Sequence, residues 1–249
     1  MNNKSLLKIG AFILALLLIG FILFIANSFL GNPISSNIAK STAKKYIAEK
    51  YSNLDLKIDS VKYNFKDGGY YAFIVSEKSI DTHFSVGVRG GKVFNDSYEY
   101  MVASGQNTID RLCKEYKNLA LPILKTKADE IVSVSVIPNK SENYGLALDV
   151  AFDKDLVTNV DLMIYIRNGK TDGSSMAKVF VECYDSLAKN GYSVAGLGVT
   201  CENSTGDLLE INNVKPTHIQ SVDFEETLKK AIENREYDGI TTFGKSLTK

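Results

Sequence analysis

The feature that most constrains this chain is an uncharged run of 31 residues, from Ile9 to Ala39. As a helix, the part from Ile9 to Leu30 would span about 33 Å, which exceeds the roughly 30 Å hydrocarbon core of a bilayer. A helix that is apolar all round has no polar face to present to water. We therefore expect residues 9–30 to form a transmembrane signal anchor, with residues 1–8 in the cytoplasm.

Two other interpretations of the run stay open. A cleaved signal peptide would use the small-x-small site at Ala26-Asn27-Ser28, although the apolar core is longer than the usual h-region of about 7–15 residues. A buried core helix is the third interpretation. The run contains no cysteine near its end, so a lipoprotein anchor is excluded.

The orientation of the anchor follows from its flanks. Lys4 and Lys8 precede the run and favour a cytoplasmic N-terminus, whereas Lys40, Lys44 and Lys45 on the other flank partly oppose that orientation. Long domains cross the membrane largely regardless of charge. We therefore expect the remainder of the chain outside the cell, and an inverted topology stays the alternative.

Charge and cysteine content exclude several classes of function. The formal net charge is +0 and the pI is about 6.7, so no basic excess indicates a nucleic-acid partner. Three cysteines are too few and too scattered for a disulfide framework or a zinc site. If Cys183 and Cys201 face one extracellular core, a disulfide between them is an open alternative.

Residues 31–126 combine helices with a run of alternating strands. Asn32-Pro33 predicts a helix start, and Ala39, Ala43 and Ile47 share one face of the helix that follows. Alternating residues then predict four strands, with a tight turn at Asp67-Gly68-Gly69. Helical spacing of apolar residues predicts a second helix over about 108–124, so we expect a helix-meander-helix domain with an antiparallel sheet.

Residues 127–237 predict a second α+β domain. Strands are expected over about 132–136, 146–152, 160–167, 192–201 and 208–214, and helices from Ser174 and Asp223. Because strands bunch together and helices flank them, α+β describes the whole chain better than alternating α/β. The tail over 238–249 is rich in Gly, Thr, Lys and Ser and is expected to be frayed.

Four segments resemble a known family: Gly31 to Ser35, Lys45 to Tyr51, Tyr63 to Tyr71, and Ser79 to Phe84. Over about residues 1–125, and more loosely over 126–249, the chain resembles the YfjL-like proteins of Firmicutes. The resemblance implies a Gram-positive cell membrane and an extracytoplasmic pair of domains, and it implies no activity. The order of helix then meander is also similar to PepSY and cystatin-like domains, which often bind peptides or proteins.

One predicted strand carries the residues of greatest chemical interest. Asp81, His83 and Ser85 are expected on one of its faces, but neighbours on one strand are poorly placed for a catalytic triad, whose members normally come from different elements. A solvated face is the better interpretation. If the domain has a binding surface, we expect it around Asp81, His83, Tyr70 and Tyr71.

The remaining candidates are weaker. His218 is a lone loop histidine. The acidic residues Asp149, Asp153, Asp155 and Asp161 lack the spacing of a calcium loop, and no glycine-rich phosphate loop is present. We therefore predict no catalytic residues, no metal site and no cofactor.

The sequence as a whole favours a single-pass membrane protein that presents two small domains outside the cell. We expect a binding or accessory role toward another membrane or cell-wall protein or a peptide. The alternative is a cell-envelope hydrolase that uses Asp81 and His83 or an acidic metal site, so enzymatic activity stays uncertain and is not our expectation.

Overall fold

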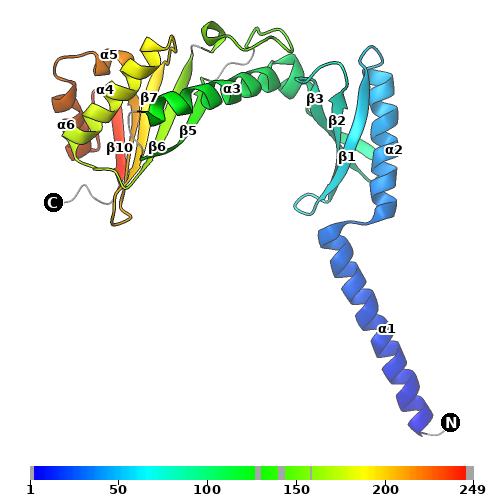
Figure 1. Cartoon of the computed structure of the whole chain (residues 1–249). Coiled ribbons are helices and arrows are strands. Elements are labelled where there is room, and N and C mark those ends of the chain that lie inside the picture. Colours follow the sequence, from blue (N-terminus) through cyan, green and yellow to red (C-terminus); the bar gives the residue numbers. More distant parts are fainter. Residues whose placement is uncertain (1–2, 127–129, 140–143, 158, 245–249) are drawn as a thin grey trace. The chain divides into compact units, whose positions relative to one another are not determined.

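An apolar helix, α1 (Asn3–Leu30), leads into two structural units (Figure 1). The computed structural model describes residues 3–126, 130–139, 144–157 and 159–244. The large apolar side chains of α1 from Ile9 to Leu30 are exposed, at 41–78% of their surface. By length and composition, this helix could cross a membrane, as the sequence predicts.

Helix α2 (Pro33–Lys50) follows α1 after a two-residue break. Asn32 caps it, because its side-chain oxygen accepts a hydrogen bond from the Ser35 amide at 2.7 Å. Ala39, Ala43 and Ile47 are buried along one side, as expected, and the two alanines bring the helix close to the sheet.

The first sheet is an antiparallel meander of four strands in sequence order. The strands are β1 (Leu56–Asn64), β2 (Gly69–Ser76), β3 (His83–Arg89) and β4 (Lys92–Asp96). Alternate residues of β2 and β3, such as Ile74 and Val86, are buried and form one core with α2. Figure 1 shows α2 alongside these strands, and their other face carries the candidate site described below.

The first unit ends earlier than the sequence predicts. After β4 comes a π-helical turn, η1 (Glu99–Ala103), and the chain divides between Asn107 and Thr108 rather than at 126/127. The predicted second helix exists as α3 (Gln106–Lys125). Its buried side chains, among them Leu112, Tyr116 and Leu124, belong to the core of the second unit. The first domain is therefore a helix followed by a meander, because the apolar stripe of α3 packs elsewhere.

The second sheet has six strands in the order β5-β6-β7-β8-β10-β9. Their bounds are β5 (Ile131–Pro138), β6 (Val160–Arg167), β7 (Gly196–Glu202), β8 (Leu208–Val214), β9 (Glu236–Tyr237) and β10 (Ile240–Gly244). All neighbouring pairs are antiparallel, as expected, except β6 and β7. That parallel pair corrects the prediction, and it arises because a helix connects the two strands.

Helices complete the core of the second unit. They are α4 (Gly173–Lys189), which joins β6 to β7, the short α5 (Pro216–Ile219) and α6 (Phe224–Asn234). Asp172 caps α4 by accepting a hydrogen bond from the Ser175 amide at 2.9 Å. Phe180 and Phe224 meet edge to face with ring centroids 6.0 Å apart, so α4 and α6 share one apolar core with α3 and the strands.

One predicted strand is absent. Residues 144–153 form turns and irregular backbone, with Gly145 and Asp149 at positive φ values of 63° and 59°. Leu146, Val150 and Phe152 of this segment still pack against the core, whereas Leu148 is 42% exposed. The apolar pattern therefore reflects burial without strand pairing. A 3-10 turn, η2 (Lys154–Leu156), follows.

The prediction of a frayed tail is wrong for residues 238–244. Ile240 has 0% of its surface exposed, and Thr242 is buried with its hydroxyl donating to the Ala231 carbonyl at 3.0 Å. Strand β10 pairs with both β8 and β9. Residues 245–249 lie outside the described part of the chain. The second domain therefore extends to at least Gly244.

Candidate functional site

The face of the first sheet that points away from α2 carries an open groove of about 570 Å³. We call it the aromatic groove, and it is lined by Asp59, Ser60, Lys62, Phe73, Ile74, Val75, His83, Phe84, Ser85, Ser97 and Met101. The strand register explains its composition. Phe73 pairs with Ser85, and Val75 pairs with His83, so these four side chains share one face of β2 and β3.

Cations lie over the aromatic rings of this face. The Lys62 ammonium lies 5.2 Å from the centre of the Phe73 ring, and the Arg89 guanidinium 4.5 Å from that of Phe94. Phe73 is 39% exposed and Phe94 is 45% exposed. The charge beside these rings is mixed, because Asp59 also lines the groove and an Asp67 oxygen lies 3.9 Å from Arg89. The face therefore offers exposed aromatic surface with a polar edge, which suits recognition of another chain.

The four predicted binding residues separate into two groups. His83 is exposed and lines the groove, and Tyr71 lies on the same face of β2. The Tyr71 hydroxyl is already engaged, because it donates to the Asp67 carboxylate at 2.6 Å. Tyr70 points to the opposite face and is 8% exposed. Its hydroxyl accepts from the Asn32 amide at 2.7 Å, so its role is to hold the start of α2.

The predicted common face of Asp81, His83 and Ser85 is not formed. Asp81 precedes β3 and is 1% exposed, whereas the His83 side chain faces solvent. The Ser85 hydroxyl lies 3.2 Å from that of Ser97, and the Ser85 amide donates to the same Ser97 oxygen at 2.9 Å. Ser85 therefore meets another hydroxyl rather than a base, and a triad reading of this strand has no geometric support.

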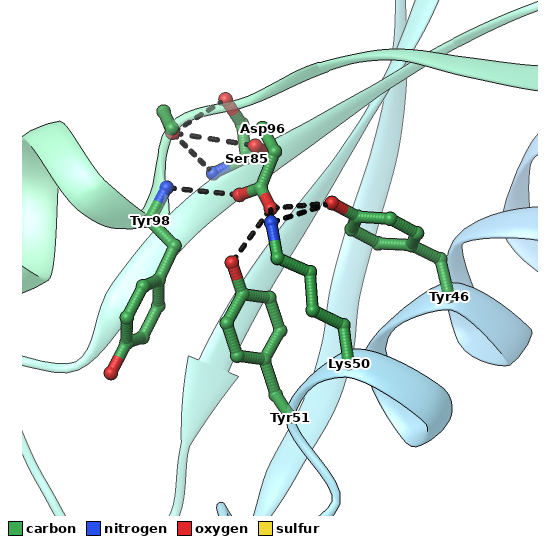
Figure 2. Close-up of polar contacts among 7 residues, drawn as sticks. Tyr46, Lys50, Tyr51, Ser85, Asp96 and Tyr98 are labelled. Carbon is green, nitrogen blue, oxygen red and sulfur yellow. Dashed lines mark hydrogen bonds and ion pairs between the residues drawn. The ribbon is translucent and has the colours of Figure 1, made fainter.

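A polar cluster at the end of α2 was missed by sequence reasoning. Figure 2 shows Asp96 of β4 at its centre. One carboxylate oxygen accepts hydrogen bonds from the Tyr46 hydroxyl and the Tyr51 hydroxyl, each at 2.7 Å, and from the Lys50 ammonium at 2.8 Å. The other oxygen accepts from the Tyr98 amide at 3.0 Å. We call these five residues the Asp96 cluster.

The electrostatics of the Asp96 cluster indicate that it stabilises the first domain rather than binds a ligand. Burial alone would raise the pKa of Asp96, but the hydrogen bonds from Lys50, Tyr51 and the Tyr98 amide outweigh it and lower the pKa. The pKa of Lys50 is raised by the same contact, and burial raises that of Tyr51 to about 12. A charged lysine is no nucleophile. A carboxylate with four donors has little capacity left for a ligand.

The second domain places two predicted candidates in one polar pocket. Asp161 and His218 both line a pocket of about 420 Å³, together with Lys215 and Asp238. His218 Nδ1 accepts from the Lys215 amide at 3.1 Å, and Nε2 lies 3.7 Å from an Asp238 carboxylate oxygen. Among the described lining residues there is no hydroxyl or thiol, so this pocket does not offer the nucleophile of a serine- or cysteine-type hydrolase.

The acidic residues do not form a metal centre. Asp153 instead caps η2 by accepting from the Asp155 amide at 3.0 Å. In the part of the chain that the structure describes, no three His, Cys, Asp or Glu side chains come together in a group that could hold a metal ion. The acidic metal site of the hydrolase alternative therefore gains no support.

All three cysteines are buried free thiols. Burial raises the pKa of Cys113 and of Cys183 to about 12 and that of Cys201 to about 11. The Cys183–Cys201 disulfide that the sequence left open is not formed. These thiols are core residues rather than nucleophiles.

Comparison with known proteins gives two family matches in order along the chain. Residues 6–97 match the family model described as "YfjL-like, N-terminal domain", and residues 115–229 match "YfjL-like C-terminal domain". The first match includes most of α1. The second begins within α3, which agrees with the placement of that helix in the second unit.

One curated relative and one solved structure are also similar. "Uncharacterized protein YfjL" of Bacillus subtilis (strain 168) is 25% identical over 230 residues, which cover 86% of this chain and 96% of that protein. A crystal structure of a DUF5037 family protein from Ruminococcus gnavus is 12% identical, with a TM-score of 0.23, covering 82% of this chain and 89% of that one.

Proposed function

Because this chain belongs to the YfjL-like family, we propose that it is a membrane-anchored accessory protein whose first domain binds another protein of the cell envelope. In this proposal α1 is a signal anchor with its N-terminus in the cytoplasm. Both domains then lie outside the cell. The N-terminal family match begins at residue 6 and so includes most of the apolar helix, which supports treating the helix as part of the family's N-terminal domain.

The aromatic groove carries the proposal. Its exposed Phe73 and half-buried Val75 lie on β2, whose other face is already packed on α2. This apolar surface with charges of both signs at its edge fits an extended segment of a partner that supplies apolar side chains and polar groups. The finer comparison with PepSY and cystatin-like domains, which share the order of helix then meander, points the same way.

The hydrolase alternative has weaker support. It requires Asp81 to act together with His83, yet Asp81 is buried and His83 is exposed. Acid–base catalysis needs both groups within reach of one substrate. A binding role does not require two catalytic groups to meet at one substrate. It requires an accessible surface, and the aromatic groove provides one.

A photo-crosslinking amino acid in place of Phe73 tests the binding role in intact cells. We expect a discrete crosslinked product, because this exposed side chain lines the aromatic groove. The control is the same reporter in place of Glu49, which is exposed on α2 in the opposite layer. Gel mobility followed by mass spectrometry of the product checks the result. The absence of product at position 73, or the same products at both positions, would overturn the proposal.

Protease added to intact protoplasts tests the topology. With the domains outside, digestion should remove the part of the chain after α1 and leave a small membrane-embedded fragment. Protoplasts lysed with detergent before digestion serve as the control for intrinsic protease resistance. Full protection in intact protoplasts together with digestion after lysis would show the inverted orientation.

A further inference from the structure

Exposed apolar residues cluster where α1 meets the first domain. Phe29 and Leu30 end α1 and are 60% and 78% exposed. Phe65, at the turn between β1 and β2, is 56% exposed, and its ring centroid lies 5.9 Å from that of Phe29. The turn of the hairpin therefore continues the apolar surface of α1 into the folded domain.

The junction between α1 and α2 is held by direct contacts, and we call it the elbow. Gly31 adopts φ of 70°, and a Cβ there would lie 2.7 Å from Tyr63 and from the Tyr70 hydroxyl. The Tyr63 hydroxyl donates to the Ser28 carbonyl at 3.0 Å, and the Asn32 amide donates to Tyr70 at 2.7 Å. The last turn of α1 and the hairpin are thus fastened together.

The length of α1 places this junction at the level of the lipid headgroups. Because the apolar span from Ile9 to Leu30 is about as long as the hydrocarbon core is thick, Phe29 and Leu30 reach its outer boundary. Phe65 touches Phe29 and therefore lies at the same depth. The half-buried ring of Tyr63 lies at the same level, and tyrosine is typical of membrane interfaces.

The charges at the hairpin turn suit a lipid surface. Lys66 is exposed next to Phe65, where an ammonium can reach the headgroups. The one acidic residue of the turn, Asp67, is directed back toward the sheet, because it accepts from the Tyr71 hydroxyl at 2.6 Å and from the Gly69 amide at 2.7 Å. An exposed aromatic ring beside an exposed cation matches the boundary between headgroups and acyl chains.

We propose that the β1–β2 turn, through Phe65 and Lys66, inserts into the surface of the bilayer that α1 spans. This second contact holds the first domain in one orientation on the membrane. The inference rests on the proposed anchoring of α1. It adds a lipid-binding role for a turn that is separate from the aromatic groove.

The chain contains no tryptophan, so single substitutions provide clean fluorescent reporters. The full chain is reconstituted in vesicles of phosphatidylcholine and phosphatidylglycerol, with bromine atoms carried either high or low on the acyl chains. Phe65→Trp should show blue-shifted emission and be quenched most strongly by the high bromine position. Tyr100→Trp is the control in the same domain. Tyr100 belongs to η1 and is 65% exposed, so the emission of this variant should stay red-shifted and unquenched.

Phe12→Trp, within α1, separates this inference from the anchor on which it rests. Phe12 lies about 4.5 Å inside the cytoplasmic end of the apolar span, so its quenching by the high bromine position reports insertion of α1. If Phe12→Trp is quenched while Phe65→Trp behaves like Tyr100→Trp, the lipid contact of the turn is refuted and the anchor stands. If Phe12→Trp is not quenched, the anchor itself is refuted. Because all three replaced side chains are exposed, none of the variants should fail to fold.

Discussion

Replacing Ile240 with alanine is expected to lower the free energy of unfolding of the second domain by about 2–5 kcal/mol. Ile240 has 0% of its surface exposed and belongs to the core formed by the strands with α3, α4 and α6. Truncation removes buried methyl groups and leaves a cavity that the surrounding strands cannot close. The effect is large for a domain whose total stability is expected to be about 5–15 kcal/mol.

The three buried cysteines make this measurement specific to the second domain, because all of them follow Thr108. Pulsed thiol labelling of the full chain across a urea titration gives the unfolding midpoint. Phe243→Ala is the control on the same strand, where the ring is 58% exposed and the expected change is within about 0.5 kcal/mol. Equal midpoints for Ile240→Ala and Phe243→Ala would show that β10 is not part of the core.

Replacing Asp96 with asparagine is expected to destabilise the first domain by about 1.5–3 kcal/mol. The Asp96 side chain is 12% exposed and accepts from Lys50 at 2.8 Å in addition to two tyrosines and a backbone amide. Asparagine keeps the shape of the side chain but loses its charge. Its NH2 group would also face hydrogen-bond donors that now bind a carboxylate oxygen. Lys50 is half exposed, so solvent screening keeps the effect below that of a fully buried ion pair.

The first domain contains no cysteine, so the measurement uses a background carrying Val86→Cys. Labelling at this fully buried position is followed by mass spectrometry of the modified peptide. Glu77→Gln is the control, because the Lys57–Glu77 pair in the same domain is 57% and 60% exposed and should contribute about 0–1 kcal/mol. If Asp96→Asn lowers the free energy of unfolding no more than Glu77→Gln does, the stabilising role of the Asp96 cluster is contradicted.

The Asp96 cluster also gives the first domain a pH dependence with a defined sign. The folded-state pKa of Asp96 is lowered, so its stabilisation is complete above the ordinary carboxyl value of about 3.9 and is lost as the pH falls through the folded value. The pKa of Tyr51 is raised to about 12, so its contribution is lost as the pH rises from about 10. Asp96→Asn should flatten the acid limb of the stability curve.

Local patterns predicted the elements of the first domain well. The Asn32 cap, the stripe of Ala39, Ala43 and Ile47, and the Asp67-Gly68-Gly69 turn each depend on neighbours within a few residues. Such patterns describe which face of an element is buried. They do not say which sheet covers it, and for that reason α3 was assigned to the first domain although its apolar stripe belongs to the second.

The remaining differences come from interactions between distant parts of the chain. Strand β10 is short and contains two threonines and a glycine, so its order derives from pairing with β8 rather than from its own sequence. The parallel pairing of β6 with β7 had a visible signal, since a strand, a helix and a strand follow one another there. Hairpins elsewhere in the chain led us to expect antiparallel neighbours throughout.

The candidate site was predicted only in part. His83 and Tyr71 lie on the face that carries the aromatic groove, as alternation along β2 and β3 indicated. The Asp96 cluster joins residues 45–50 positions apart, and only the Tyr46 and Lys50 spacing of one helical turn was visible in the sequence. No local pattern links either residue to Asp96.

The elbow at Gly31 has a mechanical consequence for a protein in a bilayer. Tyr63 and Tyr70 bind the chain on either side of Gly31, so hydrogen bonds link the last turn of α1 directly to the first domain. A membrane helix adapts to a thinner bilayer by tilting, at a cost of fractions of a kcal/mol per Å of mismatch. If α1 spans a bilayer as proposed, that tilt would move the aromatic groove toward or away from the lipid. Bilayer thickness would then set the angle at which the proposed partner meets the groove.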